Sequence, residues 1–281
     1  MTSVPDAPGL SRVRRPTRVY PGYVFDLDGT VYLGGNVLPG VFETLAYLRA
    51  SGSGLAFLSN NPLELPGMYA ERLRRLGIVA EDHEVVSSID ALVRYLGEYP
   101  PKGPILTVAE PLLENVLRDA GHRITGDPGE ATMVVVAWDR TFDYAKLERA
   151  FRAARAGARI VASNPDPYCP TPDGGLPDCG AILASIEVAS GVRAEAIVGK
   201  PSRHMAAVVL DRLGLVPTDV LVVGDRLLTD VGMAHEAGMA GALVLTGATS
   251  RADLESSSVR PDFVLEGLDQ LIPAGRQEGT P

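Results

Sequence analysis

Two aspartates, Asp26 and Asp28, directly follow a short apolar run in the segment YVFDLDGTVYLGG. Alternate side chains of a strand point to the same face, so the two carboxylates would share a face while the chain stays extended. Such a pair offers an oxygen-only anchor for Mg2+, or an ionised nucleophile beside a protonated acid. Gly29 would let the backbone turn closely and leave N–H groups to bind an anion. The alternative is a pair of aspartates that only solvates a turn.

Three further polar clusters follow apolar runs in the same way. They are SNN at 59–61, GKPS at 199–202 and GDRLLTD at 224–230. In an open parallel sheet, the residues just past the carboxyl ends of the strands converge on one crevice. We therefore expect these clusters and the aspartate pair to meet in space, although they are far apart in the sequence.

Each cluster also has an explanation that needs no chemistry. Most lysines are solvated, and Lys200 could simply lie at the start of a helix. Asp225 and Asp230 could cap a helix N-terminus, and residues 59–61 could form a turn before Pro62. The occurrence of all the clusters directly after apolar runs favours a functional site.

The rest of the chain alternates short apolar runs with amphipathic stretches. The runs are rich in Val, Ile and Leu without polar alternation, which is typical of parallel strands covered on both faces. The expected strands are residues 23–27, 55–59, 105–109, 133–138, 158–163, 196–199, 220–224, 242–246 and 262–266. The expected helices, each ending in Gly, are residues 66–77, 143–157, 179–191 and 201–214. This alternation predicts an α/β fold with right-handed crossovers.

A stretch of the size of a small domain separates SNN from GKPS and carries strands and helices of its own. We expect it to form an inserted α/β domain at residues 87–178, joined through two hinges and covering the crevice. The core domain would comprise residues 17–86 and 179–272. The ends, residues 1–16 and 273–281, are predicted to be flexible tails.

The composition limits the classes of function. The chain has 281 residues, 46% of them hydrophobic, and a formal net charge of −9, which disfavours non-specific binding to nucleic acid or anionic membranes. No apolar run approaches the roughly 20 residues that span a bilayer, and the N-terminal segment lacks a secretory signal. A cytoplasmic protein is therefore predicted. Cys169 and Cys179 make no CxxC spacing and no HExxH pattern is present, so free thiols are predicted rather than a disulfide or a zinc site.

In their order along the chain, the clusters resemble the motifs of the haloacid dehalogenase-like phosphatases. FDLDGTVY resembles the first motif of that family, LSNN the second, VGKPS the third and VVGDRLLTD the fourth. The insert resembles the type-two cap, and VVVAWDRTFDYAKL with VASNPDPYCPTPDGG resembles the branch of NagD and of the nucleotide, phosphoglycolate, pyridoxal-phosphate and nitrophenyl-phosphate phosphatases. The resemblance extends from Tyr23 to Phe263. It implies a Rossmann-like parallel-sheet core with an inserted α/β cap domain.

The resemblance implies a Mg2+-dependent phosphomonoesterase that acts on a small phosphorylated metabolite. Asp26 would be the nucleophile that forms an aspartyl-phosphate, and Asp28 would protonate the leaving oxygen and later activate water. Asp26, Asp225 and the backbone carbonyl of Asp28 would hold Mg2+, and Asp230 would hold its outer ligands. Phosphoryl transfer mainly needs an in-line nucleophile and neutralisation of the equatorial oxygens.

The second and third motifs imply the contacts to the phosphoryl group. The hydroxyl of Ser59 and the N–H of Asn60 would cradle phosphate oxygens beside Lys200, with Asn61 completing the motif. Lys200 would neutralise the charge of the phosphate and of the nucleophile.

The loop NPDPYCP of the insert is the expected specificity loop. Its candidate substrate-binding residues are Asn164, Asp166, Tyr168 and Cys169. The alternative is a proline-braced connection between the domains that does not contact the substrate. In the segment VVVAWDR of the insert, Trp138 stands where the family usually has small or aliphatic residues. Its side chain could either fill the core of the insert or line the bottom of the substrate pocket.

The same fold could also carry a dehalogenase, a phosphotransferase or a non-catalytic regulatory function. A haloacid dehalogenase needs one aspartate nucleophile and neither metal nor leaving-group acid, so Asp28, Asp225 and Asp230 argue against it. A phosphotransferase would differ only in its acceptor, which sequence rarely fixes. A non-catalytic regulatory member is disfavoured because Asp26 and Lys200 are both present. The insert could also mediate homodimer formation through its apolar VVVAW strand.

Overall fold

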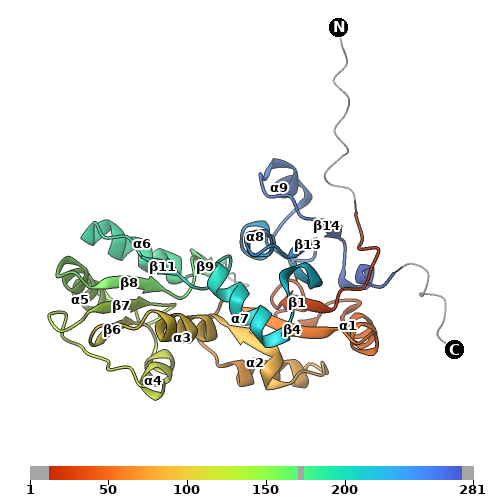
Figure 1. Cartoon of the computed structure of the whole chain (residues 1–281). Coiled ribbons are helices and arrows are strands. Elements are labelled where there is room, and N and C mark those ends of the chain that lie inside the picture. Colours follow the sequence, from red (N-terminus) through yellow and green to blue (C-terminus); the bar gives the residue numbers. More distant parts are fainter. Residues whose placement is uncertain (1–12, 170–173, 274–281) are drawn as a thin grey trace, which may run out of the picture. The chain divides into compact units, whose positions relative to one another are not determined.

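The computed structural model describes residues 13–169 and 174–273, so the predicted tails lie largely outside the described residues. The chain forms two compact units, and Figure 1 labels most of their helices and strands. The first unit comprises the described parts of Met1–Leu58, Ala70–Val85 and Val209–Pro281, and the second comprises those of Ser59–Tyr69 and Val86–Val208. The chain therefore passes from one unit to the other within β4, α2, β5 and α7.

The first unit is built around a six-stranded sheet of order β14-β13-β12-β1-β4-β5. The strands are β1 (Gly22–Asp26), β4 (Gly54–Ser59), β5 (Val85–Ser87), β12 (Val220–Gly224), β13 (Ala240–Val244) and β14 (Phe263–Leu265). β1 pairs in parallel with both β12 and β4, and β13 continues the parallel arrangement from β12 to β14. The helices that begin or end in this unit are α1 (Val41–Ala50), α2 (Pro66–Arg75), α7 (Arg203–Leu213), α8 (Gly232–Glu236) and α9 (Arg251–Ser256).

The burial of β1 explains why its sequence does not alternate. Tyr23, Val24 and Phe25 are all fully buried, although successive side chains of a strand point to opposite faces. Both faces of this central strand are therefore covered, as its unbroken apolar run predicts.

The second unit contains a four-stranded sheet of order β11-β8-β7-β6, in which every pair is parallel. Its strands are β6 (Ile105–Val108), β7 (Met133–Val136), β8 (Arg159–Ala162) and β11 (Ala196–Ile197). The helices of this unit are α3 (Ser88–Glu98), α4 (Pro111–Asp119), α5 (Tyr144–Arg155) and α6 (Cys179–Ser190). Two small antiparallel hairpins complete the structure, β2 (Tyr32–Leu33) with β3 (Asn36–Val37), and β9 (Tyr168–Cys169) with β10 (Leu176–Pro177).

The expected boundary at residues 178 and 179 differs from the observed grouping. We expected the helix at 179–191 and the strand at 196–199 to belong to the core domain. Instead, Ile182 and Ile186 of α6 join the apolar cluster of the four-stranded sheet, and β11 pairs with β8. The physical reason is that α6 buries its apolar face against β7 and α5 of that unit. That residues 87–178 act as a cap stays a prediction.

The expected α/β fold is confirmed, and each expected strand and helix is present in the described residues. The sequence did not predict β5 or the two hairpins, because strands of two or three residues carry too little pattern to detect. The helices α1, α3, α4, α8 and α9 were also not among those expected by residue range. Cys169 and Cys179 are not joined to each other in a disulfide. Among residues 13–169 and 174–273, no helix is long and apolar enough to cross a membrane.

Candidate active site

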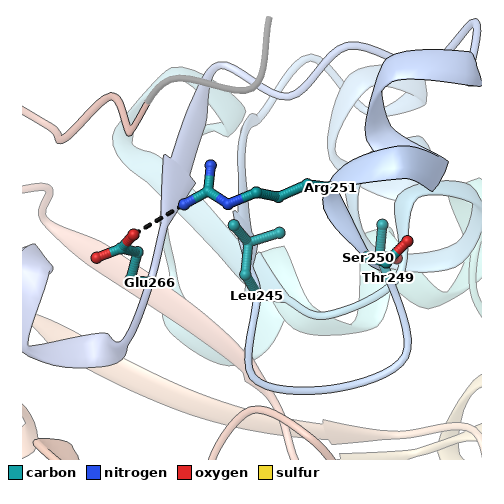
Figure 2. A pocket seen from close by; sticks show the side chains of 5 residues that line it. All are labelled: Leu245, Thr249, Ser250, Arg251 and Glu266. Carbon is teal, nitrogen blue, oxygen red and sulfur yellow. Dashed lines mark hydrogen bonds and ion pairs between the residues drawn. The ribbon is translucent and has the colours of Figure 1, made fainter.

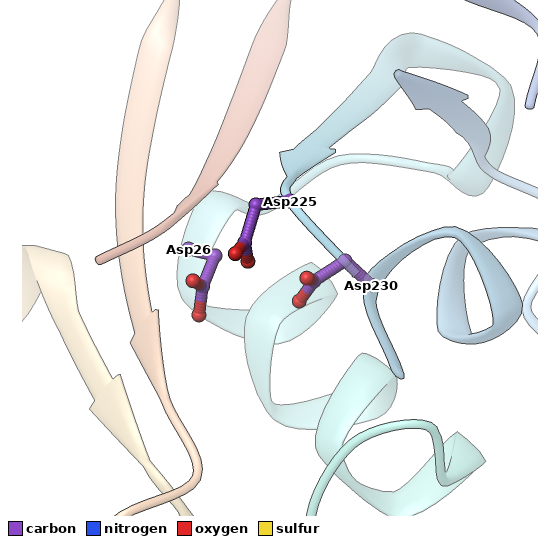
Figure 3. A group of neighbouring side chains, drawn as sticks. All are labelled: Asp26, Asp225 and Asp230. Carbon is purple, nitrogen blue, oxygen red and sulfur yellow. The ribbon is translucent and has the colours of Figure 1, made fainter. Parts of the chain in front are cut away.

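Three aspartates from different segments of the first unit lie together. One carboxylate oxygen from each of Asp26, Asp225 and Asp230 lies within 4.8 Å of the others. Figure 3 shows the three side chains pointing toward one another. Asp225 and Asp230 are buried and Asp26 is half-buried, so solvent only partly screens these carboxylates. The expected meeting of the first and fourth motifs is thus observed.

The sheet brings Asp26 and Asp225 together. β1 and β12 are parallel neighbours, and Phe25 pairs with Val223. Asp26 is the last residue of β1 and Asp225 directly follows β12, so the two aspartates lie at the same edge of the sheet. On the other side of β1, Asp26 pairs with Leu58, the residue before Ser59.

The turn after β1 passes close to Asp225. Gly29 adopts the left-handed conformation with φ +85°, and its N–H donates to the carbonyl of Tyr32 at 2.8 Å. A Cβ at Gly29 would lie 2.5 Å from Oδ2 of Asp225. Glycine is required here for two reasons, because the backbone conformation is unfavourable for other residues and because no side chain would fit.

A loop at residues 246–249 also surrounds Asp225, and sequence analysis missed it. The N–H of Ala248 donates to Asp225 Oδ2 at 2.5 Å, and Thr246 Oγ1 donates to the carbonyl of Gly29 at 2.6 Å. A Cβ at Gly247 would overlap the Asp225 carboxylate. Only Leu245 separates the sequence TGAT from the end of β13, so the rule that identified the other clusters could have identified this one.

The same loop borders a cavity of about 310 Å³ that is lined by Leu245, Thr249, Ser250, Arg251 and Glu266 (Figure 2). Its lining includes an ion pair between Arg251 Nη2 and Glu266 Oε1 at 2.8 Å. None of the three clustered aspartates lines this cavity. It is therefore distinct from the aspartate site.

Asp230 lies in a π-helical turn at Leu227–Val231. Its Oδ2 accepts a hydrogen bond from the N–H of Arg226 at 3.1 Å, and a Cβ at Gly224 would overlap its side chain. A π-helical turn widens the helix locally and is frequent at functional sites. Here it places Asp230 against the end of β12 and facing Asp225.

The donor set of this cluster fits a hard divalent cation. Carboxylate oxygens are the protein ligands that Mg2+ prefers, and each of the three aspartates brings one within 4.8 Å of the other two. Asp26, Asp225 and Asp230 could therefore hold Mg2+. The Asp28 side chain is exposed at the turn and does not belong to the three-carboxylate group.

Tyr32 is a buried neighbour of the aspartate turn that sequence analysis did not identify. Its hydroxyl lies 3.5 Å from Arg72 Nη1. Burial raises the pKa of Tyr32, and the negative charge of Asp28 raises it further. The phenol therefore stays protonated at neutral pH and adds no charge beside the carboxylates.

The second and third motifs lie together in the second unit, around Asn60. The Oδ1 of Asn60 accepts a hydrogen bond from the N–H of Lys200 at 2.7 Å, and its Nδ2 donates to the carbonyl of Lys200 at 3.2 Å. The Lys200 residue is buried. Nearby, Ser59 Oγ accepts a hydrogen bond from the N–H of Asn61 at 3.2 Å and donates to the Tyr69 hydroxyl at 3.3 Å.

Two residues of the expected specificity loop also bind Asn60. Asp166 Oδ2 accepts a hydrogen bond from Asn60 Nδ2 at 2.9 Å. Asn164 is fully buried, and its Nδ2 donates to the carbonyl of Asn60 at 3.1 Å. The sequence did not predict these contacts, because Asn164 and Asp166 lie 104 and 106 positions after Asn60.

The other residues of that loop are placed differently. Tyr168 and Cys169 form β9, and the Tyr168 side chain is exposed. Their contact with a substrate stays a prediction. Trp138 is buried, in keeping with the alternative that it fills the core of the insert.

Comparison with known proteins identifies the family. The sequence profile of the haloacid dehalogenase-like hydrolases matches residues 23–123, and a second profile, described as HAD-hydrolase-like, matches residues 197–271. The sugar-phosphatase AraL of Bacillus subtilis is 33% identical over 250 residues, which cover 89% of this chain and 91% of that protein. The chain belongs to the haloacid dehalogenase-like hydrolases. The resemblance seen in the four motifs is confirmed.

Solved structures of two phosphatases share the fold. The 4-nitrophenylphosphatase of Thermotoga maritima has a TM-score of 0.85 and 32% identity, covering 94% of this chain and 98% of its own. The glycerol phosphate phosphatase of Mycobacterium tuberculosis, solved in complex with magnesium, has a TM-score of 0.82 and 31% identity, covering 92% of this chain and 78% of its own. This hydrolase is a phosphatase of the nitrophenylphosphatase branch.

Proposed function

We propose that this phosphatase is a Mg2+-dependent phosphomonoesterase that hydrolyses a small phosphorylated metabolite through an aspartyl-phosphate. The observation that carries the proposal is the group of three carboxylates within 4.8 Å of one another at the carboxyl ends of β1 and β12. Three negative charges this close together, two of them buried, repel one another, so the group is best explained by a cation that they hold in common.

Asp26 would begin the reaction. One of its carboxylate oxygens attacks phosphorus in line, the bond between phosphorus and the ester oxygen breaks, and Asp28 gives its proton to the departing oxygen. Water then attacks the phosphorus of the aspartyl-phosphate while Asp28 takes a proton from it. Inorganic phosphate leaves and both aspartates return to their starting states. The exposed side chain of Asp28 suits a residue that exchanges protons with water and with the leaving group.

The remaining motif residues would bind the phosphoryl group. We assign neutralisation of its oxygens to Lys200 and a hydrogen bond to Ser59, as their motif positions imply. Mg2+, when held by the carboxylates, would add positive charge beside the phosphoryl oxygens. The buried position of Lys200 supports this assignment, because a buried ammonium group requires a compensating anionic or polar environment.

The substrate class is proposed from the relatives. Their names include a sugar phosphatase and a glycerol phosphate phosphatase, so small phosphorylated polyols and sugars are the first candidates. No observation favours a dehalogenase, since Asp225 and Asp230 stand beside the nucleophile. A phosphotransferase would show product transfer to an added alcohol in place of phosphate release.

The test is phosphate release from glycerol phosphate, sugar phosphates, phosphoglycolate, nucleotides and pyridoxal phosphate, with Mg2+ or with chelator. We expect turnover in Mg2+ only, and a loss of more than about 1000-fold in Asp26→Asn because its amide cannot attack phosphorus. Release that persists in Asp26→Asn would exclude the aspartyl-phosphate. Release that is insensitive to chelator would exclude the metal.

A further inference from the structure

The amide of Asn60 binds both backbone polar groups of Lys200. Oδ1 of Asn60 accepts the Lys200 N–H at 2.7 Å, and Nδ2 donates to the Lys200 carbonyl at 3.2 Å. A side-chain amide has a distinct donor end and acceptor end, so both bonds form in only one of its two orientations. The backbone of Lys200 is therefore held only when Asn60 points the right way.

Asp166 selects that orientation. Its Oδ2 accepts the second N–H of Asn60 Nδ2 at 2.9 Å. An ionised carboxylate is only an acceptor, so a rotated amide would place Oδ1 against Asp166 and Nδ2 against the N–H of Lys200. Both contacts would be repulsive, and the amide would lose its bonds at both ends.

The surrounding contacts leave little freedom for an alternative arrangement. Asn164 Oδ1 accepts the N–H of Asp166 at 3.0 Å, and Ser88 Oγ donates to the carbonyl of Asn60 at 2.7 Å. A Cβ at Gly199 would lie 2.7 Å from Asn60 Oδ1, so the strand end before Lys200 approaches the amide as closely as glycine permits. The group is therefore packed and hydrogen-bonded from several directions.

We propose that Asp166 is a positioning residue for Lys200, which it fixes through the amide of Asn60. This role differs from the substrate contact expected from the sequence, and it rests on the proposed part of Lys200 in phosphoryl transfer. A displaced ammonium group stabilises the charge of the transition state less, whereas ground-state binding of the organic half of the substrate is little changed. Loss of Asp166 should therefore lower kcat more than it raises KM.

The first experiment compares Asp166→Ala with Asp166→Asn, using 4-nitrophenyl phosphate and Mg2+. We expect kcat to fall by about 10- to 100-fold in Asp166→Ala, the scale of a misplaced catalytic group. In Asp166→Asn the side-chain oxygen still accepts the Asn60 bond, so kcat should stay within about 3-fold of the native value. Equal kcat losses in the two variants, or a change in KM alone, would overturn the proposal.

A matched control separates positioning from stability. Asp143 caps α5 in the same unit, where its Oδ1 accepts the N–H of Lys146 at 2.8 Å. Asp143→Ala also removes a carboxylate and should lower the Tm because the helix cap is lost, but it should leave kcat unchanged. A similar kcat loss in Asp143→Ala would show that the Asp166 effect is merely structural.

Exchanging the amide of Asn60 with the carboxylate of Asp166 gives a sharper test. Asn60→Asp places a second carboxylate against Asp166, and kcat should fall by at least about 10-fold. In the double variant, Asn60→Asp with Asp166→Asn, the new amide can donate to the new carboxylate and part of the activity should return. A double variant no more active than Asn60→Asp would contradict the proposal.

Amide hydrogen exchange at Lys200 provides a readout that does not require activity. The exchange of its N–H should be faster in Asp166→Ala than in the native protein or in Asp166→Asn, because the bond to Asn60 Oδ1 is lost. If the native protein releases no phosphate, the proposed function fails, and this exchange still decides whether Asp166 fixes Lys200. Unchanged exchange in Asp166→Ala would refute the role.

Discussion

At the scale of single residues, the aspartate cluster depends on glycines as much as on its carboxylates. A Cβ at Gly29 or at Gly247 would collide with Asp225, and one at Gly224 would collide with Asp230. These three positions let three backbone segments close around the carboxylates. The cluster is therefore a product of close backbone approach, which only glycine permits.

Gly29→Ala should lower the activity of the aspartate site in addition to the stability that any alanine loses in this backbone conformation. Gly52 is a matched control, since its φ is +80° against +85° for Gly29, and a Cβ there would meet nothing within 4 Å. Both alanine variants should lose on the order of 1 kcal/mol of unfolding free energy. Only Gly29→Ala should also lose Mg2+-dependent turnover, by about 10-fold or more, because Asp225 must move. Unfolding curves and kcat of both variants test this, and equal activities would contradict it.

At the scale of elements, α6 shows how one apolar face assigns a helix to a sheet. Its first residue, Cys179, is fully buried, and its Sγ lies 3.4 Å from the carbonyl of Val136 in β7. Ile182 and Ile186 lie one and two turns further along the same face and join the same apolar cluster. The helix is therefore part of the second unit.

The buried thiol of Cys179 should make stability depend on pH in the alkaline range. Burial raises its pKa from 9.0 to about 11, so the folded protein retains a proton that the unfolded chain releases. This contribution is fully present below pH 9.0 and is lost as the pH rises toward about 11. The native protein should lose on the order of 2 kcal/mol more than Cys179→Ala over this range.

Urea unfolding of both proteins at pH 8 and pH 11 measures the difference. The Cys179→Ala variant keeps every other titratable group of the native protein and therefore controls for their contribution to the pH dependence. Parallel losses in the two proteins would show that Cys179 does not carry the effect.

At the scale of the whole molecule, binding of a cation to the clustered carboxylates should affect the stability of the folded protein. The chain carries a formal net charge of −9, and three of its carboxylates are clustered in the first unit. A cation held by this cluster would bind the folded state and not the unfolded chain. Mg2+ should therefore stabilise the whole protein, apart from any effect on catalysis.

Mg2+ at 100 times its Kd should add about 2.7 kcal/mol to the unfolding free energy. The corresponding increase in Tm is roughly 5 °C. Chelator should remove it, and Asp225→Asn should abolish it because one of three carboxylate ligands is lost. Asp211→Asn removes the same charge at an exposed position of α7 and should keep the full shift. A Tm shift that survives in Asp225→Asn would place the metal elsewhere.

The sequence by itself predicted the elements and the chemistry of the aspartates. Unbroken apolar runs mark buried parallel strands, and Asp26 and Asp225 directly follow two of them. These signals are local, because burial and chain reversal impose the residue types within a few positions. The strands, the α/β class and the family could therefore be predicted without a structure.

Long-range contacts were decided only by the tertiary structure. The pairing of Ala196 with Val161 assigned β11 to the four-stranded sheet, and the hydrogen bond from Asn60 to Asp166 linked the second motif to the expected specificity loop. A residue's own sequence neighbourhood specifies whether it is buried or turns the chain, but a partner 35 or 106 positions away is specified only by how the elements pack.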